Sequence, residues 1–101
     1  MIYITQLIYI NEGQEEAFNE FESFAIPIIS NYKGELILRV RPSTESYIHA
    51  TEEKPYEIHL IKFESEQDFQ EFMLNDERKK YLHLKERSIR ESFLVKGEKL
   101  Q

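Results

Sequence analysis

Two residues in the stretch EIHLIKF, Glu57 and His59, have side chains that could take part in acid–base chemistry. They lie two positions apart, so in a β-strand both would point to the same face. Imidazole exchanges a proton near neutral pH, which makes His59 a candidate general acid or base. The alternative is that both are polar groups that face water. If the protein is an enzyme, we predict His59 as the catalytic residue.

A second polar pair precedes them in LILRVRP, where Arg39 and Arg41 alternate with apolar residues. In a functional interpretation, the two arginines hold an anionic substrate while His59 transfers a proton. In a structural interpretation, the same side chains and Glu57 form a charge network, because buried unpaired charge is costly with or without a ligand. We keep both interpretations. The candidate ligand-binding residues are Arg39, Arg41, Glu57 and Tyr3, whose ring could line a cavity or pack in a core or interface.

Other site chemistries find little support in the sequence. The three histidines, His49, His59 and His83, have no metal-ligand spacing, and the chain has no cysteine. We therefore predict no metal site and no disulfide. A glycine-rich phosphate loop, a nucleotide fingerprint and a Ser–His–acid signature are all missing, so we predict no cofactor.

Composition bounds the class of protein. The chain has 101 residues, 41% of them hydrophobic and 13% aromatic, which is the composition of one globular domain spanning residues 1–101. Its net charge of −6 argues against nucleic acid as a partner. The opening stretch MIYITQLIYI has neither the basic region of a signal peptide nor the length of a membrane span. We expect a cytoplasmic protein without a membrane partner.

Hydrophobic periodicity defines the elements that must position these residues. Residues 2–10 predict a strand that is apolar on both faces. The helix that follows carries an apolar stripe from Ala17 to Ile28, with Glu22 among its outward residues, and either ends near Ala25 or kinks at Pro27. Gly34 is expected to have a positive φ. Further strands are predicted at 35–41, 56–63 and 92–98, and further helices at 65–73 and 76–90, with a break near residues 75–76.

The order βαββαβ predicts an α+β, ferredoxin-like sandwich: a four-stranded antiparallel sheet with both helical segments on one face. Leu36, Leu38 and Val40 should face the helices. Ile37, Ile61 and Phe63 should lie on the uncovered face, so we predict a homodimer in which two sheets pack face to face. Arg39, Arg41, Glu57 and His59 would then share the uncovered face and lie in the dimer cleft, with Arg39 or Arg41 paired to Glu57 across adjacent strands.

The sequence resembles the dimeric α+β barrel superfamily, and most closely an uncharacterised bacterial family of unknown function within it. The resemblance covers most of the chain and rests on structural residues: Ala25, Pro27 and Gly34 leading into LILRVRP, the stretch EIHLIKFESEQDFQEFMLND, and Arg87, Ser88 and Ser92 before FLVKGE. Lys33 departs from the pattern, since that family usually has a second glycine there. The superfamily includes cofactor-free monooxygenases and isomerase-like proteins, whose ligands lie in the barrel or between sheet and helices.

Three functions follow as hypotheses. The first is a homodimeric protein that binds a small organic ligand, an anion among the options, in its cleft. The second is an enzyme of the cofactor-free monooxygenase or isomerase kind, with His59 as acid–base group. The third is a structural or regulatory interaction module without a ligand, which predicts sheet faces that pack without leaving a pocket.

Overall fold

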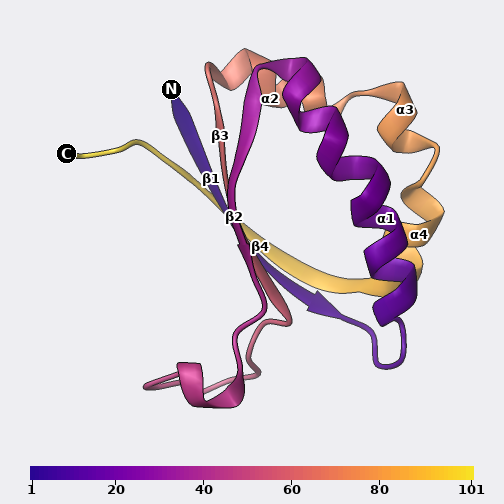
Figure 1. The fold of residues 1–101 in the computed structure, drawn as a ribbon, viewed down its shortest axis with the longest axis vertical. Helices are drawn as coiled ribbons and strands as arrows, with labels where there is room; N and C mark the ends of the chain where they lie inside the picture. Colours follow the sequence, from indigo (N-terminus) through magenta and orange to yellow (C-terminus); the bar gives the residue numbers. More distant parts are fainter.

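The structure, a computed structural model, describes residues 1–101 and has two layers, a sheet and the helices that cover one of its faces (Figure 1). Its four strands are antiparallel in the order β2-β3-β1-β4. This is the predicted ferredoxin-like α+β fold. The elements are β1 (Ile2–Ile10), α1 (Glu15–Ile28), η1 (Ile29–Tyr32), β2 (Gly34–Val40), η2 (Thr44–Ser46), β3 (Glu57–Phe63), α2 (Glu66–Met73), α3 (Asp76–Lys79), α4 (Leu82–Ser88) and β4 (Ile89–Gly97). No helix has both the length and the apolar character needed to cross a membrane.

Helix α1 does not end at Ala25, because Pro27 lies within its last turn and the chain continues into η1. Its apolar stripe is buried as predicted except at Phe24, which is 38% exposed. Glu22 is buried as well and is only 6% exposed. Glu22 follows Phe18 by four residues and precedes Ala25 by three, so it falls on the buried side of the helix. The prediction that Glu22 faces outward is therefore wrong.

The turn between η1 and β2 depends on two residues with different roles. Lys33 has the positive φ, 60°, in the left-handed region. Gly34, for which we predicted that φ, instead permits close packing: a Cβ atom there would lie 2.6 Å from Ile29 Cγ2 and 2.7 Å from Phe63 Cε1. A glycine at position 33 would adopt this conformation without strain.

The core lies between the sheet and the helices and has two clusters. The larger joins β1 and β3 to α1, η1 and α2, and the smaller joins α1 to α4. Ser65 caps α2 by accepting a hydrogen bond from the Asp68 amide at 3.1 Å. Asn75 caps α3, so the predicted break falls at the right place. The larger cluster contains Ile4, Ile28, Ile29, Ile61, Phe63, Phe69 and Phe72; the smaller contains Ala17, Phe21, Ala25 and Leu84.

Strand β2 contains a bulge at Ile37 that exchanges the two faces of the strand. Leu36 pairs with Ile61, whereas Leu38, two residues later, pairs with Leu60, the next residue of β3. Regular alternation would place Leu36 and Leu38 on one face. In the structure Leu36 packs against the core, while Leu38 lies on the open face of the sheet and is 42% exposed.

The faces predicted for β3 are therefore wrong. Glu57, His59, Ile61 and Phe63 are all buried on the helix-covered face, and Ile58 and Leu60 alternate with them. Two core phenylalanines on the helices explain the choice, because Phe63 packs on both Phe69 and Phe72, with ring centroids 5.4 and 5.5 Å apart. Glu57 and His59 are thus enclosed between the sheet and the helices and do not lie on the open face.

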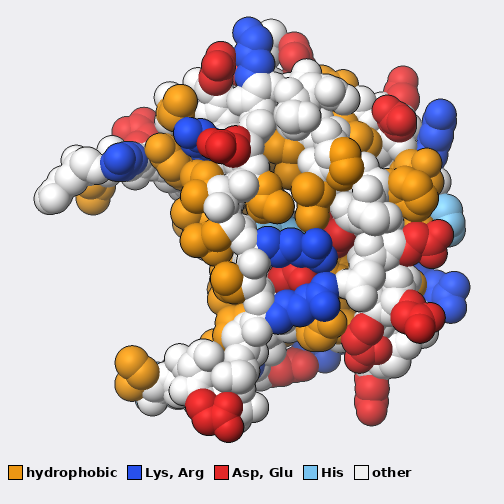
Figure 2. All heavy atoms as spheres, viewed as in Figure 1, with side chains coloured by type: hydrophobic (Ala, Val, Ile, Leu, Met, Phe, Trp, Pro, Cys, Tyr) orange, Lys and Arg blue, Asp and Glu red, His pale blue; other side chains and the backbone are white.

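The open face of the sheet is nonetheless apolar. Figure 2 shows hydrophobic side chains along the hollowed side of the molecule that faces away from the helices. The segment between β2 and β3, which includes η2, projects on this side, as does the C-terminal tail (Figure 1). Strand pairing places Tyr3, Leu7, Tyr9, Leu38, Val40, Ile58, Leu60, Phe93 and Val95 on this face.

Candidate functional site

Glu57 is the centre of the polar cluster. Its Oε2 accepts a hydrogen bond from Arg39 Nε at 2.7 Å, and its Oε1 accepts one from Arg41 Nε at 2.7 Å. Oε2 also contacts Nε2 of His59. The Arg39 pairing follows from the register, since Arg39 lies opposite His59 on the neighbouring strand. We predicted that either Arg39 or Arg41 pairs with Glu57, and in the structure both do.

The cluster keeps Glu57 ionised although its side chain is completely buried. Burial by itself would raise the pKa of Glu57, but the hydrogen bonds from His59, Arg39 and Arg41 outweigh it and lower that pKa to about 2. The same contact with Glu57 raises the pKa of Arg41. Glu57 is therefore a permanent hydrogen-bond acceptor at neutral pH.

Arg41 ties this cluster to α1 and to the loop before β3. Its Nη2 donates to Oδ1 of Asn19 on α1, and its guanidinium lies over the ring of Tyr56, 5.0 Å from the centroid. Arg39 and Arg41 are partly exposed, with side-chain exposures of 33% and 43%. They therefore support Glu57 from the outside of the fold.

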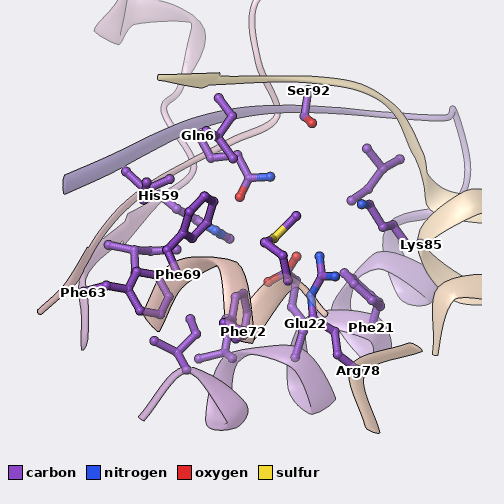
Figure 3. Close-up of a pocket in the computed structure, with 18 residues that line it drawn as sticks. Gln6, Phe21, Glu22, His59, Phe63, Phe69, Phe72, Arg78, Lys85 and Ser92 are labelled. Carbon is purple, nitrogen blue, oxygen red and sulfur yellow. The ribbon is translucent and has the colours of Figure 1, made fainter. Parts of the chain in front are cut away.

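On the inner side of His59, a cavity of about 130 Å³ lies between the sheet and the helices (Figure 3). Most of its wall is apolar and comes from β1, β3, α1, η1, α2 and β4. The polar side chains that line it are Gln6, Glu22, His59, Arg78, Lys85 and Ser92. An apolar cavity with a few convergent polar groups is the usual form of a small-molecule site.

The contact with Glu57 decides which nitrogen of His59 can act on a ligand. Because Glu57 is an ionised acceptor, the Nε2 atom of His59 carries the proton of this contact, which leaves Nδ1 as the ring nitrogen that can face a ligand. Nδ1 forms no hydrogen bond to another protein group. The Nδ1 edge of the His59 ring therefore has no partner within the protein, and the ring lines the cavity.

Three charged residues of the cavity wall lie on the helical side, where Glu22 and Arg78 point toward one another (Figure 3). Burial raises the pKa of Glu22 and lowers the pKa of Arg78. The pKa of Lys85 is lowered by burial and by repulsion from Arg78. All three groups are thus partly withdrawn from water.

The sequence interpretation missed these three residues. Glu22 could have been found from its place on the apolar stripe of α1. Arg78 and Lys85 lie seven residues apart in a run of mixed charges, a spacing that recurs on one side of a helix.

The predicted site residues fall into three groups. His59 lines the cavity, and Glu57, Arg39 and Arg41 lie behind it as its support. Tyr3 pairs with Lys62 and Gly97 on the open face, on the other side of the sheet from the cavity. No group of three or more metal-ligating side chains is present.

Comparisons with known proteins extend the fold assignment. No family model matches the sequence, and no curated protein matches it. Among solved structures, RPA0582 from Rhodopseudomonas palustris, a protein of unknown function, matches with a TM-score of 0.81 at 13% identity, over 99% of this chain and 82% of the other.

Two other similar structures have names that bear on the hypotheses. A candidate antibiotic biosynthesis monooxygenase from Nitrosomonas europaea matches with a TM-score of 0.75 at 10% identity, over 100% of both chains. A dimeric protein of unknown function with a ferredoxin-like fold, from Bacteroides fragilis, matches with a TM-score of 0.71 at 10% identity, over 97% of this chain and 95% of the other. At such identities the likeness concerns the fold alone. The chain has the ferredoxin-like fold found in dimeric α+β barrel proteins, as the resemblance predicted.

Proposed function

We propose that this protein binds a small organic molecule in the cavity between the sheet and the helices. The observation that supports it most is the wall of this cavity, which is mainly apolar but contains the free nitrogen side of His59. This differs from the predicted location in a dimer cleft. The size of the ligand follows from the volume: about 130 Å³ is close to the ~150 Å³ of an engineered apolar cavity that holds benzene.

A thermal-shift screen with single-ring compounds tests the proposal. The wild type is compared with Ala25→Leu, which adds side-chain volume to the cavity wall, and with Ala50→Leu, the same change in the exposed loop between β2 and β3. Ligands should raise the melting temperature of the wild type and of Ala50→Leu, but not of Ala25→Leu. Ser92→Leu narrows the cavity from β4 if Ala25→Leu does not fold. Equal shifts in all variants, or no shift with any compound, would refute the proposal.

A second function, acid–base catalysis on the bound ligand, is favoured by the fixed tautomer of His59. Glu57 holds Nε2–H, so Nδ1 can accept a proton from a carbon or oxygen acid in the cavity. Proton abstraction is the step that an isomerase needs, and it would also produce the carbanion that a cofactor-free monooxygenase brings to molecular oxygen. The name of the Nitrosomonas europaea protein is consistent with the latter.

Deuterium exchange measures this step without knowledge of the substrate. Acetophenone, a single-ring ketone with exchangeable α-protons, is incubated with the protein in D₂O and followed by NMR. The wild type should accelerate exchange above the buffer rate, and His59→Gln should lose the acceleration. His83→Gln, a change of the exposed histidine on α4, should retain it. Exchange at the buffer rate with wild type would argue against this function.

We also propose that two copies pack through the open faces of their sheets. Nine aromatic or aliphatic side chains lie on that face, and a sheet with one apolar face uncovered needs a partner. The dimeric protein from Bacteroides fragilis has the same fold.

A cytoplasmic location, which suits a chain without cysteine, completes the proposal. Failure of every ligand test would favour the third hypothesis, an interaction module without a ligand.

A further inference from the structure

The two cationic side chains on the helical side of the cavity, Arg78 and Lys85, have the carboxylates of Glu22 and Glu86 in their surroundings, but neither is held in an ion pair. Neither Arg78 nor Lys85 forms a salt bridge with any carboxylate. Nε of Arg78 is buried and has no hydrogen-bond acceptor. A buried donor without an acceptor costs free energy, and most such groups in proteins have partners. A group that the protein does not contain would satisfy this one.

Counting charges on the wall gives the sign of the missing group. The charged residues that line the cavity are Arg78, Lys85 and Glu22. Even with Glu22 fully ionised, two positive charges face one negative charge, and the raised pKa of Glu22 increases this excess. The protein as a whole carries −6, so the positive wall is a local arrangement and does not reflect overall composition.

The other charged cluster does not remove this excess. Glu57 is already bound by both Arg39 and Arg41, and its remaining contact is with His59. The guanidinium of Arg78 instead lies over the ring of Phe72, 5.2 Å from its centroid. A cation held against an aromatic face keeps its N–H edges free for an acceptor.

The geometry points to a ligand with a single ring and one carboxylate, and we propose that Arg78 and Lys85 bind that carboxylate at the helical side of the cavity while the ring contacts the apolar wall. This inference rests on the proposed function, because it presumes that the cavity holds a ligand. His59 is on β3 and the two cations are on α3 and α4, so the carboxylate and the group that faces His59 lie at different sides of the cavity (Figure 3). The ligand is thus oriented: Arg78 and Lys85 are binding residues, and His59 faces the rest of the molecule.

Three probes of equal ring size but different charge test the inference. Benzoate, benzyl alcohol and benzylamine are titrated into the full chain at pH 7 and followed by calorimetry or ligand-detected NMR. Benzoate should bind at least 10-fold more tightly than benzyl alcohol, since a hydrogen bond to a charged group contributes about 1.5–3 kcal/mol, which is a factor of roughly 10 to 100. Benzylamine should bind more weakly than the alcohol.

Charge-removing variants assign the effect to residues. Arg78→Gln and Lys85→Gln should each weaken benzoate binding by about 10-fold or more and change benzyl alcohol binding by less than about 3-fold. Lys80→Gln removes an exposed lysine that does not line the cavity, and it should leave both affinities unchanged. Arg78→Lys keeps the positive charge but not the planar set of N–H donors, so it should reduce benzoate affinity less than Arg78→Gln does. If Arg78→Gln does not fold, Lys85→Gln provides the test.

The outcomes separate this inference from the proposed function. If benzyl alcohol and benzoate bind the wild type equally, or if Arg78→Gln and Lys85→Gln weaken both probes alike, the carboxylate site is refuted and the ligand cavity stands. If none of the three probes binds, both are refuted. A benzoate preference that the two variants abolish and Lys80→Gln retains supports both.

Discussion

Leu36 and Arg39 point to the same face of the sheet, although they are three residues apart in one strand. An unbroken strand would place them on opposite faces. The bulge at Ile37 adds one residue to β2, so that Leu36 enters the core and Arg39 still lies beside Glu57 under the helices. Because of this one inserted residue, the same strand places Leu36 against the core and Arg39 in hydrogen bond with the buried carboxylate of Glu57.

Deleting Ile37 should therefore disrupt the protein far more than truncating it. The deletion restores regular alternation, which turns either Leu36 or the two arginines to the open face. We expect a loss of several kcal/mol in the free energy of unfolding, measured by urea denaturation, because a buried charge without its partners costs about 3–5 kcal/mol. Ile37→Ala, which keeps the bulge at a 41% exposed side chain, should cost less than about 1 kcal/mol. Similar losses in both variants would contradict the role of the bulge.

Stability in acid should depend on Glu57. Its pKa is about 2 in the folded protein against an ordinary value of 4.5, so ionised Glu57 stabilises the fold. This contribution is complete above about pH 5 and is lost as the pH falls toward about 2. Its size is about 3 kcal/mol, from about 1.4 kcal/mol for each pH unit between the two values. Urea midpoints of the wild type between pH 7 and pH 2.5 should fall accordingly.

The variant Glu57→Gln should lose most of that stability at pH 7 and show a flatter dependence on pH below about 5. Glu35→Gln is the control, since Glu35 forms a 3.0 Å pair with Lys62 but is 63% exposed. An exposed pair contributes about 0–1 kcal/mol, so this variant should follow the wild type closely. Parallel pH curves for Glu57→Gln and the wild type would rule out the proposed linkage.

Glu22→Gln should stabilise the protein at neutral pH. Burial raises the pKa of Glu22, so keeping it ionised costs free energy above its folded pKa, and this cost disappears below the ordinary value near 4.5. The variant should thus unfold at a higher urea concentration than the wild type at pH 7, and the difference should vanish in acid. It should also bind benzoate more tightly, because it removes the only carboxylate of the cavity wall. Glu20→Gln, an exposed position on the same helix, should show neither effect.

The turn before β2 offers a pair of opposite substitutions. Lys33→Gly should stabilise the protein by about 1 kcal/mol, because a non-glycine residue in the left-handed region carries strain. Gly34→Ala should destabilise it by about 1–3 kcal/mol, since the added methyl meets Ile29 and Phe63 at less than 3.0 Å. Thermal unfolding of the two variants checks both signs. A stabilising Gly34→Ala would mean that this packing is looser than described.

The proposed dimer should depend on the open face of the sheet and not on the helical side. Phe93→Glu introduces a charge at a 54% exposed position among the apolar residues of that face, and it should convert the dimer to a monomer in light scattering. Leu74→Glu places the same charge at a 68% exposed leucine directly after α2 and should leave the dimer intact. A wild type that is monomeric at micromolar concentration would contradict the assembly itself.

Local signals in the sequence were enough to predict the element order, the ferredoxin-like topology and the pairing of Arg39 or Arg41 with Glu57. Hydrophobic periodicity and turn residues are local signals, and they place elements within a few residues. Residues two apart in β3 had to share a face, and so did Arg39 and Arg41 in β2. The four-residue cluster could therefore be predicted as a cluster.

The face of the sheet on which that cluster lies depends on long-range packing, which local signals do not contain. Periodicity says which residues point the same way, but not which face the helices will cover when both faces carry apolar residues. Ile61 and Phe63 lie on the helix-covered face because they pack in one core cluster with Phe69 and Phe72. Glu57 and His59 alternate in step with them along β3, so they lie on the same face. The bulge at Ile37 and the inward side chains of Arg78 and Lys85 depend on the same packing, so no local pattern could reveal the cavity between the sheet and the helices.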